Sequence, residues 1–221
     1  MILNTVIFDM DGLLIDSEPL WKEAADRLLS VYGKQLTPQQ YARTTGLRTK
    51  EFLSYWFRHF NLPESGLAVS EKQIVADVIN LVKQKGRPMP GVDHIFQFFR
   101  ELGFRIGLAS SSAPELINVV IDLLDIRRHL QAFTSADDLA FGKPHPEVYL
   151  NCAAELEAAP NQCICFEDSF NGMIAAKAAK MHCVVVPSMH DSKNPVWEAA
   201  DLKISTLRNF NGLLLNRLQN I

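Results

Sequence analysis

The sequence has no long hydrophobic run, few cysteines and no block of basic residues. No stretch of about twenty apolar residues occurs, so a transmembrane helix is excluded. The 22 basic and 25 acidic residues give a formal charge of -3, and no cluster of them suggests a polyphosphate partner such as DNA. None of the four cysteines belongs to a C-x-x-C pair, which fits a reducing compartment better than a disulfide framework. We therefore expect a cytoplasmic protein with a small-molecule ligand and with no nucleic-acid or membrane partner.

Several signatures of hydrolases are missing as well. No C-x5-R loop, G-x-S-x-G elbow or H-E-x-x-H helix occurs, so nothing supports thiol-, serine- or zinc-dependent phosphatase chemistry. The six histidines are scattered, and we expect them to be structural or solvated. Catalysis would have to depend on other side chains.

Short apolar runs alternate with helical patterns over most of the chain. Runs of this length without polar alternation are typical of buried parallel strands. We expect such strands at Leu3–Phe8, Phe104–Ala109, Cys163–Phe166 and Cys183–Val186. Helical patterns lie at Glu115–Leu124, Glu147–Leu156 and Asn171–Lys180. The alternation predicts an α/β fold with a Rossmann-like parallel sheet and helices on both faces, in three α/β/α layers.

One interval between the first two strands interrupts this alternation. It shows no convincing strand but four helical patterns, at Trp21–Val31, Gln39–Thr44, Thr49–Phe60 and Ser70–Lys85. A helical block in this position is typical of an inserted cap, and the Gly- and Pro-rich run at 86–91 would be the return hinge. We expect a helical cap domain over residues 17–87 and an α/β core domain over residues 1–16 and 88–221.

The first strand ends in Phe8-Asp9-Met10-Asp11-Gly12. Two carboxylates so close together at a strand end are costly to desolvate, and a divalent cation would relieve their repulsion. The carboxyl ends of strands in parallel sheets are also where ligands bind. The alternatives are a surface turn or a calcium loop, but Leu13 stands where a calcium loop needs an oxygen ligand.

The second strand runs into Ser110-Ser111-Ser112 before a helix. A hydroxyl and free backbone amides near a helix start can bind an anion. A serine that only caps the helix is the simpler alternative.

A lysine stands in the run Gly142-Lys143-Pro144-His145-Pro146. The flanking prolines restrict the chain, so Lys143 would be aimed at a defined point. The alternative is a solvated surface lysine.

A third strand end carries adjacent acids, Glu167 and Asp168, followed by Ser169. They would add oxygen ligands to the same metal, unless Asp168 or Ser169 only caps a helix. Together, the four clusters supply a nucleophile, an anion site, a cation and a metal site, which are the components that phosphoryl transfer needs.

The order of these motifs resembles the haloacid dehalogenase superfamily with a helical cap, and the resemblance covers essentially the whole chain. Within that superfamily the sequence most resembles the bacterial hexitol and 2-deoxyglucose-6-phosphate phosphatases, and next β-phosphoglucomutase. The matching segments are FDMDGLLIDSE from Phe8, GLAS from Gly107, KPHPEVYL from Lys143 and EDSFNGM from Glu167.

The resemblance implies a phosphatase for small phosphorylated metabolites, such as sugar or sugar-alcohol phosphates. Asp9 would attack phosphorus to form an aspartyl-phosphate, and Asp11 would act first as general acid and then as general base. The phosphoryl oxygens would be held by Ser110, the Ser111 amide and Lys143.

The resemblance also implies a Mg²⁺ cofactor. Its ligands would be Asp9, the Asp11 carbonyl and Asp168, with Glu167 oriented nearby. In the cap, Glu18, Trp21 and the loop Gly46-Leu47-Arg48 would face the rest of the substrate. The oligomeric state is expected to be a monomer or a weak dimer.

Two other functions stay open. A β-phosphoglucomutase-like enzyme would share the fold, metal and nucleophile, but a histidine of that family is replaced here by Trp21, which favours hydrolysis. A non-catalytic binding protein on the same scaffold is disfavoured because Asp9 and Asp11 are both retained.

Overall fold

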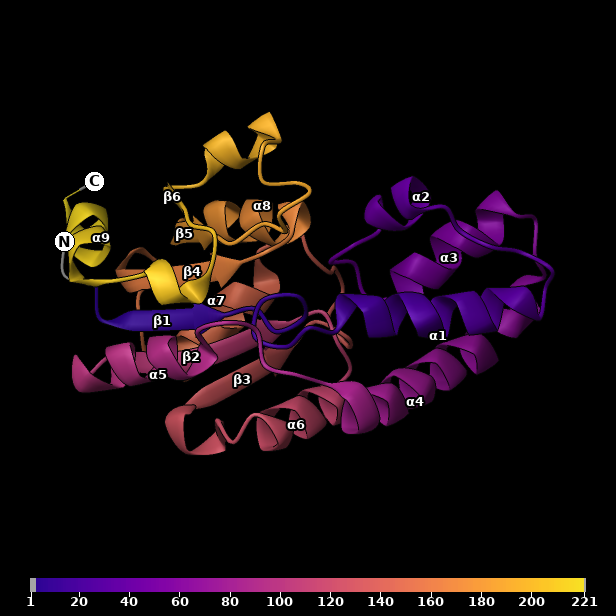
Figure 1. The fold of residues 1–221 in the computed structure, drawn as a ribbon, viewed down its shortest axis with the longest axis horizontal. Helices are drawn as coiled ribbons and strands as arrows, with labels where there is room; N and C mark the ends of the chain where they lie inside the picture. Colours follow the sequence, from indigo (N-terminus) through magenta and orange to yellow (C-terminus); the bar gives the residue numbers. More distant parts are fainter. Residues whose placement is uncertain (1–2, 221) are drawn as a thin grey trace.

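The computed structural model describes residues 3–220; residues 1, 2 and 221, which the expected core domain includes, lie outside this range. Its centre is a parallel sheet with the strand order β3-β2-β1-β4-β5-β6 (Figure 1). The strands are β1 (Thr5–Phe8), β2 (Arg105–Ser110), β3 (Ala132–Ser135), β4 (Cys163–Glu167), β5 (His182–Val185) and β6 (Leu202–Lys203). The expected parallel α/β sheet is confirmed.

Helices cover both faces of the sheet because successive strand residues point to opposite sides. Val6 and Phe8 of β1 face one apolar cluster, and Ile7 faces the other. The first cluster includes residues of α5 (Val92–Glu101), α6 (Pro114–Leu123) and α9 (Gly212–Gln219). The second includes residues of α7 (Glu147–Glu155) and α8 (Phe170–Ala178). The three-layer arrangement is therefore as expected.

A helical insertion lies between β1 and β2. It consists of α1 (Glu18–Ser30), α2 (Pro38–Ala42), α3 (Thr49–His59) and α4 (Leu67–Lys85). Figure 1 shows these helices as a block beside the sheet and its covering helices, and α4 packs against both α1 and α3. The expected helical cap is confirmed as an insertion, whereas its limits at residues 17 and 87 stay a prediction.

The two connections between the insertion and the sheet run side by side. The Asp16 N–H donates to the Arg87 carbonyl and the Met89 N–H donates to the Leu14 carbonyl, both at 2.9 Å. This paired linker is the one place where the chain enters and leaves the helical block, so it is suited to act as a hinge.

Short 3-10 turns complete the described elements, at Glu64–Gly66, Arg127–His129, Pro160–Gln162, Pro195–Ala199 and Leu207–Asn209. Strands β3 and β6 and helices α5 and α9 were not predicted from the sequence. Across residues 3–220, no helix combines the length and the apolar character needed to cross a membrane.

Candidate active site

The expected core residues meet at the carboxyl edge of the sheet. β1 lies between β2 and β4, and its last residue, Phe8, pairs with Leu108 of β2 and Phe166 of β4, close to the ends of those strands. Asp9 directly follows β1, whereas Ser110 and Glu167 end β2 and β4. Three motifs far apart in the sequence therefore converge at the edge where parallel sheets bind ligands.

The Lys143 ammonium is buried between two carboxylates. Its Nζ donates to Asp9 Oδ1 and Glu167 Oε1, each at 2.6 Å, and to the Ala109 carbonyl at 3.1 Å. Only 2% of the residue is exposed. Burial alone would lower the pKa of Lys143, but Asp9 and Glu167 outweigh it and raise this pKa above its ordinary value. Lys143 is a protonated cation at the base of the site, and not a solvated surface lysine.

Both carboxylate oxygens of Glu167 are occupied by protein donors. Oε1 accepts from Lys143 and from the Tyr149 hydroxyl at 2.5 Å. Oε2 accepts from the Ser169 N–H at 3.3 Å and from the Ser169 hydroxyl at 3.1 Å. Gly172 leaves room for this carboxylate, since a Cβ there would lie 1.8 Å from Oε1. Glu167 is thereby fixed as the partner of Lys143.

Tyr149 and Ser169 were not predicted as members of the site. Tyr149 stands in the first turn of the expected helix Glu147–Leu156 and is fully buried. Ser169 also accepts from the Gly172 N–H at 3.1 Å, so it caps α8, an alternative that the sequence left open.

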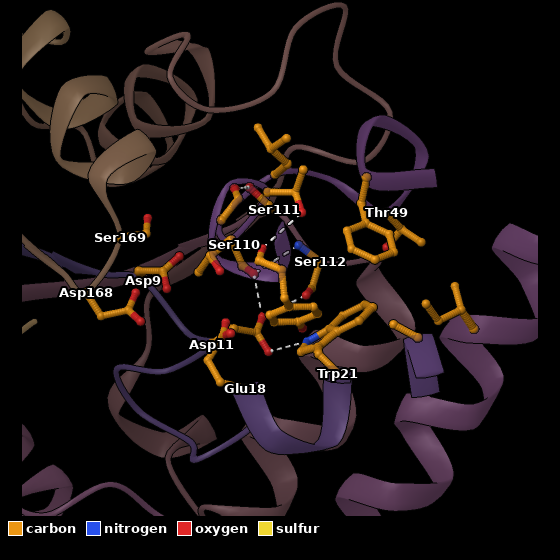
Figure 2. A pocket seen from close by; sticks show the side chains of 18 residues that line it. Asp9, Asp11, Glu18, Trp21, Thr49, Ser110, Ser111, Ser112, Asp168 and Ser169 are labelled. Atoms are coloured by element: carbon orange, nitrogen blue, oxygen red, sulfur yellow. Dashed lines mark hydrogen bonds between the residues drawn. The ribbon is translucent and has the colours of Figure 1, made fainter. Parts of the chain in front are cut away.

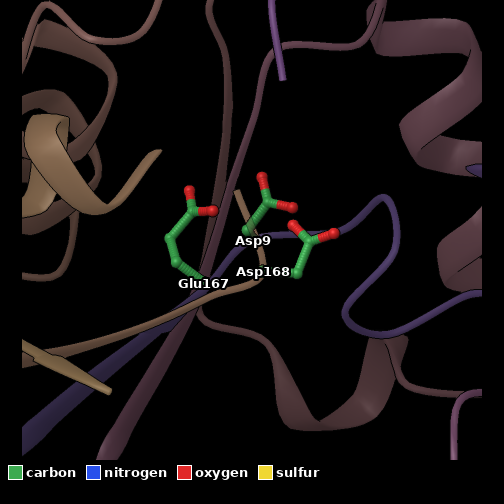
Figure 3. Close-up of side chains that lie close together, drawn as sticks. All are labelled: Asp9, Glu167 and Asp168. Atoms are coloured by element: carbon green, nitrogen blue, oxygen red, sulfur yellow. The ribbon is translucent and has the colours of Figure 1, made fainter. Parts of the chain in front are cut away.

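Asp168 completes a group of three carboxylates (Figure 3). One oxygen from each of Asp9, Glu167 and Asp168 lies within 4.8 Å of the others. Burial is the largest cause that raises the pKa of Asp9 and of Asp168 well above the ordinary range; neighbouring carboxylates add to the rise, and Lys143 opposes it. Two such carboxylates favour either a shared proton or a bound cation.

The donor set fits a hard divalent cation. All of its members are carboxylate oxygens, which Mg²⁺ and Ca²⁺ prefer. Within residues 3–220 no hydrogen-bond donor occupies the Asp168 carboxylate, whereas Glu167 is saturated, so Asp9 and Asp168 are the groups left for an ion. Gly12 makes their approach possible: its φ is +77°, and a Cβ there would lie 2.1 Å from Asp168 Oδ2.

Asp11 is held by donors from both the core and the helical insertion (Figure 2). Oδ1 accepts from the Ser17 hydroxyl at 2.7 Å and from the Trp21 indole N–H at 3.0 Å. Oδ2 accepts from the Ser112 hydroxyl at 2.7 Å and from the Ser110 hydroxyl at 3.5 Å. Ser17 and Ser112 were not predicted as contacts, although both stand within the motifs that the sequence singled out.

The serine loop after β2 contacts the insertion as well. Ser110 is buried and its Oγ accepts from the Ser112 N–H at 3.0 Å. The Ser111 hydroxyl donates to the Gly46 carbonyl at 2.9 Å, and the Asn171 side chain donates to the Thr45 carbonyl at 3.2 Å. The loop that was expected to hold phosphoryl oxygens is thus tied to the loop that was expected to face the substrate.

A cavity lies between the sheet edge and the helical insertion (Figure 2). Of the residues expected to face the substrate, Ser111, Glu18 and Trp21 line it, together with Asp9, Asp11 and Asp168. Burial raises the pKa of Glu18 to about 7, and the carboxylates of Asp11 and Asp16 add to this rise.

Arg48 does not line this cavity. Its guanidinium is buried and Nη1 donates to the carbonyls of Ala136 at 3.2 Å and Leu139 at 2.6 Å, while Nη2 pairs with Glu51. Lys50 Nζ donates to the Asp137 carbonyl. Arg48 was expected to face the substrate, but it and Lys50 instead bind backbone carbonyls of the loop that leads to Lys143.

A family model described as haloacid dehalogenase-like hydrolase matches residues 3–180, which is most of the chain. The chain belongs to the haloacid dehalogenase-like hydrolases.

Individual relatives of this hydrolase agree with that assignment. Hexitol phosphatase B of Escherichia coli (strain K12) is 39% identical over 204 residues, which cover 91% of each protein. A structure of β-phosphoglucomutase from Clostridium difficile superposes with a TM-score of 0.88 and 22% identity, over 100% of this chain and 98% of that one. A structure of CbbY from Rhodobacter sphaeroides in complex with xylulose-(1,5)bisphosphate superposes with a TM-score of 0.85 and 21% identity, over 96% and 98% of the two chains.

The predicted residues of this haloacid dehalogenase-like hydrolase thus fall into two groups. The core residues converge on one edge of the sheet: Asp9, Asp11, Ser110, Lys143, Glu167 and Asp168. Among the residues expected to face the substrate, Arg48 alone is turned away from the cavity.

Proposed function

We propose that this hydrolase is a Mg²⁺-dependent phosphatase for small phosphorylated metabolites, namely sugar or sugar-alcohol phosphates. The observation that carries the proposal is the set of carboxylates at the sheet edge, with Lys143 bound to Asp9 and Glu167 and with Asp168 left unpaired within residues 3–220. The 39% identity to hexitol phosphatase B supports the substrate class.

Asp9 is the proposed nucleophile. One of its carboxylate oxygens attacks phosphorus, the bond from phosphorus to the ester oxygen breaks, and Asp11 gives a proton to the departing oxygen. Water then attacks the aspartyl-phosphate, Asp11 takes a proton from that water, and phosphate and free Asp9 result. The Ser110 hydroxyl and the Lys143 ammonium stabilise the charge on the phosphoryl oxygens.

Asp9 and Asp168, with the Asp11 carbonyl, would hold Mg²⁺, which would neutralise negative charge on the phosphoryl group when bound. Glu167 acts through Lys143, because both of its oxygens are already hydrogen-bonded. The side chains alone concentrate so much negative charge at this point that an anionic phosphoryl group would otherwise be repelled.

A hexose phosphate mutase is the alternative with the same chemistry up to the aspartyl-phosphate. It must keep Asp11 from activating water until a sugar hydroxyl arrives. The residue beside Asp11 is Trp21, whose indole donates one hydrogen bond and relays no proton. This contact supports hydrolysis. A binding protein without activity would have no need for a nucleophile, acid and cation assembled in one place.

The state of the cysteines supports a proposal for the cellular location of the protein. All four cysteines, which lie within residues 3–220, are free and buried. That state suits a reducing cytoplasm. We propose a cytoplasmic enzyme, monomeric or weakly dimeric, whose partner is its phosphate-ester substrate.

Phosphate release from a panel of phosphorylated sugars and polyols tests the proposal. We expect turnover with Mg²⁺, none in excess chelator, and a loss of about 10³-fold or more for Asp9→Asn, because an amide is no nucleophile. Asp122→Asn, a substitution on the exposed part of α6, is the matched control and should leave turnover unchanged. Release that persists in chelator, or a folded Asp9→Asn protein with more than about a tenth of normal turnover, would refute the mechanism.

A further inference from the structure

The cavity has two ends of different chemistry. The sheet edge contributes carboxylates and serines, whereas the helical insertion contributes mainly apolar and hydroxyl side chains. We call the latter surface the cap wall. It consists of Trp21, Ala25, Tyr41, Thr44, Thr45, Gly46, Leu47, Thr49, Phe52 and Ile74.

The cap wall offers hydroxyls and no positive charge. Among the described residues that line the cavity there is no lysine, arginine or histidine, and the charged side chain that the insertion adds is Glu18. The Thr44 hydroxyl is used by the Trp56 indole at 3.1 Å. Tyr41 and Thr49 have hydroxyls to which no hydrogen bond from residues 3–220 is made, so they remain available to a ligand.

Two buried cations beside cavity residues are committed elsewhere. Lys143 is bound to Asp9 and Glu167 beneath the sheet edge. Arg48 is bound to Glu51 and to backbone carbonyls. Neither can turn to the cap wall without leaving buried partners unsatisfied, which is costly.

A second phosphate at the cap wall would therefore be poorly stabilised. It would lose water, meet no cation, and lie near the Glu18 carboxylate. The fold itself does not impose this limit, because CbbY was solved with xylulose-(1,5)bisphosphate. The selection must come from the side chains of the wall.

We infer that the cap wall selects phosphomonoesters with an uncharged, hydroxyl-bearing leaving group and rejects bisphosphates, with Tyr41 and Thr49 as the groups that meet those hydroxyls. This inference rests on the proposed phosphatase function and narrows its substrate class. It also bears on the mutase alternative. Transfer of a phosphoryl group between two hydroxyls of one hexose, through an enzyme-bound phosphate, passes through a bisphosphate that must bind in both orientations.

The test compares glucose 6-phosphate with glucose 1,6-bisphosphate as inhibitors of the hydrolysis of the best ester in the panel, at equal free Mg²⁺. We expect the bisphosphate to bind about 100-fold more weakly than the monophosphate, as expected for an uncompensated charge. Inhibition constants within about threefold of each other would overturn the inference. Inhibition by neither compound would contradict the hydroxyl-bearing leaving group. Failure of every ester in the panel to release phosphate would instead refute the proposed function.

Thr49→Lys adds a cation to the cap wall, and Thr49→Met adds similar bulk without charge. The lysine should improve bisphosphate binding relative to monophosphate binding at least about tenfold, whereas the methionine should leave that ratio unchanged. An unchanged ratio in a folded Thr49→Lys protein would show that Thr49 does not face the leaving group. If the Thr49→Lys protein does not fold, the inhibition constants of the two glucose phosphates on the natural protein still test the inference.

Discussion

The sheet edge and the cap wall border the same cavity but are built in different ways. At the sheet edge a network of hydrogen bonds fixes the central charges: Lys143 is held by Asp9 and Glu167, and Glu167 also by Tyr149 and Ser169. At the cap wall, side chains from α1, α2, α3, α4 and the loop between α2 and α3 surround the space without such a network. The first arrangement suits a chemical step that requires one geometry. The second can be altered residue by residue, which suits the selection of a leaving group.

Loss of Lys143 should have the largest effect among substitutions outside the nucleophile. We expect Lys143→Met to reduce phosphate release about 10³-fold, because a desolvated cation that contacts the transition state is worth several kcal/mol. It should also lower the melting temperature, since two buried carboxylates lose their partner. The measurements are initial rates and thermal unfolding on the purified variant.

Lys177→Met is the matched control for this variant. Lys177 also forms a salt bridge, with Asp201 at 2.7 Å, but it is partly exposed and lies away from the cavity. Such pairs contribute about 1 kcal/mol or less, so activity should stay within about twofold. Equal activity of the two folded variants would place Lys143 outside the reaction.

The sheet edge was largely predictable because its residues follow strands in a parallel sheet. Strand ends at Asp9, Ser110 and Glu167 had to meet once the sheet was recognised, since parallel strands share one carboxyl edge. The edge strands β3 and β6 escaped prediction because they are short and lack the continuous apolar run of the inner strands. Helix α5 was missed although Ile95, Phe96 and Phe99 form a buried face.

The contacts of the cap were not predictable in the same way. The loop at Arg48 shows a basic residue two positions after a glycine, a pattern that fits both a ligand contact and a structural anchor. The choice depends on which backbone carbonyls lie within reach, and Ala136 and Leu139 are about ninety residues away in sequence. Long-range partners of this kind leave no local pattern.

Substitution of Arg48 tests whether this residue attaches the insertion to the core or contacts the substrate. Its hydrogen bonds join the insertion to the loop before Lys143, so Arg48→Met should weaken that attachment and reduce kcat/KM about tenfold. Because Arg48 does not line the cavity, the loss should be similar for every active ester. Kinetics on three esters of different size would measure it.

Arg58→Met, on the exposed face of the same helix α3, is the control for Arg48 and should leave kinetics unchanged. A change in the ranking of the three esters on substitution of Arg48 would show that its side chain reaches the substrate, as the sequence first suggested. Such a change would also make the loop at Arg48 part of the surface that selects the substrate. Arg48 could then no longer be described as a purely structural contact outside the cap wall.

Glu18 lies where the two regions meet, and the effect expected of its substitution is on stability rather than on turnover. Its pKa is raised from 4.5 to about 7 by burial and by the nearby carboxylates of Asp11 and Asp16. A carboxyl with a higher pKa in the folded than in the unfolded protein binds more protons when folded. Its ionisation therefore costs almost no stability below about pH 4.5; the cost grows between pH 4.5 and about 7 and stays constant above that.

Glu18→Gln removes this carboxylate and should stabilise the protein at pH 8 but not at pH 4.5. The rise from 4.5 to about 7 is about 2.5 pKa units at about 1.4 kcal/mol each, so a gain of up to about 3.5 kcal/mol, or about 10 °C in melting temperature, is expected at pH 8. Thermal unfolding in excess chelator measures it, with Glu155→Gln on the exposed face of α7 as the reference for a surface carboxylate. A gain in stability that is equal at both pH values would mean that the pKa of Glu18 is not raised in the folded protein. The negative potential invoked against a second phosphate at the cap wall would then have to come from Asp11 and the sheet edge alone.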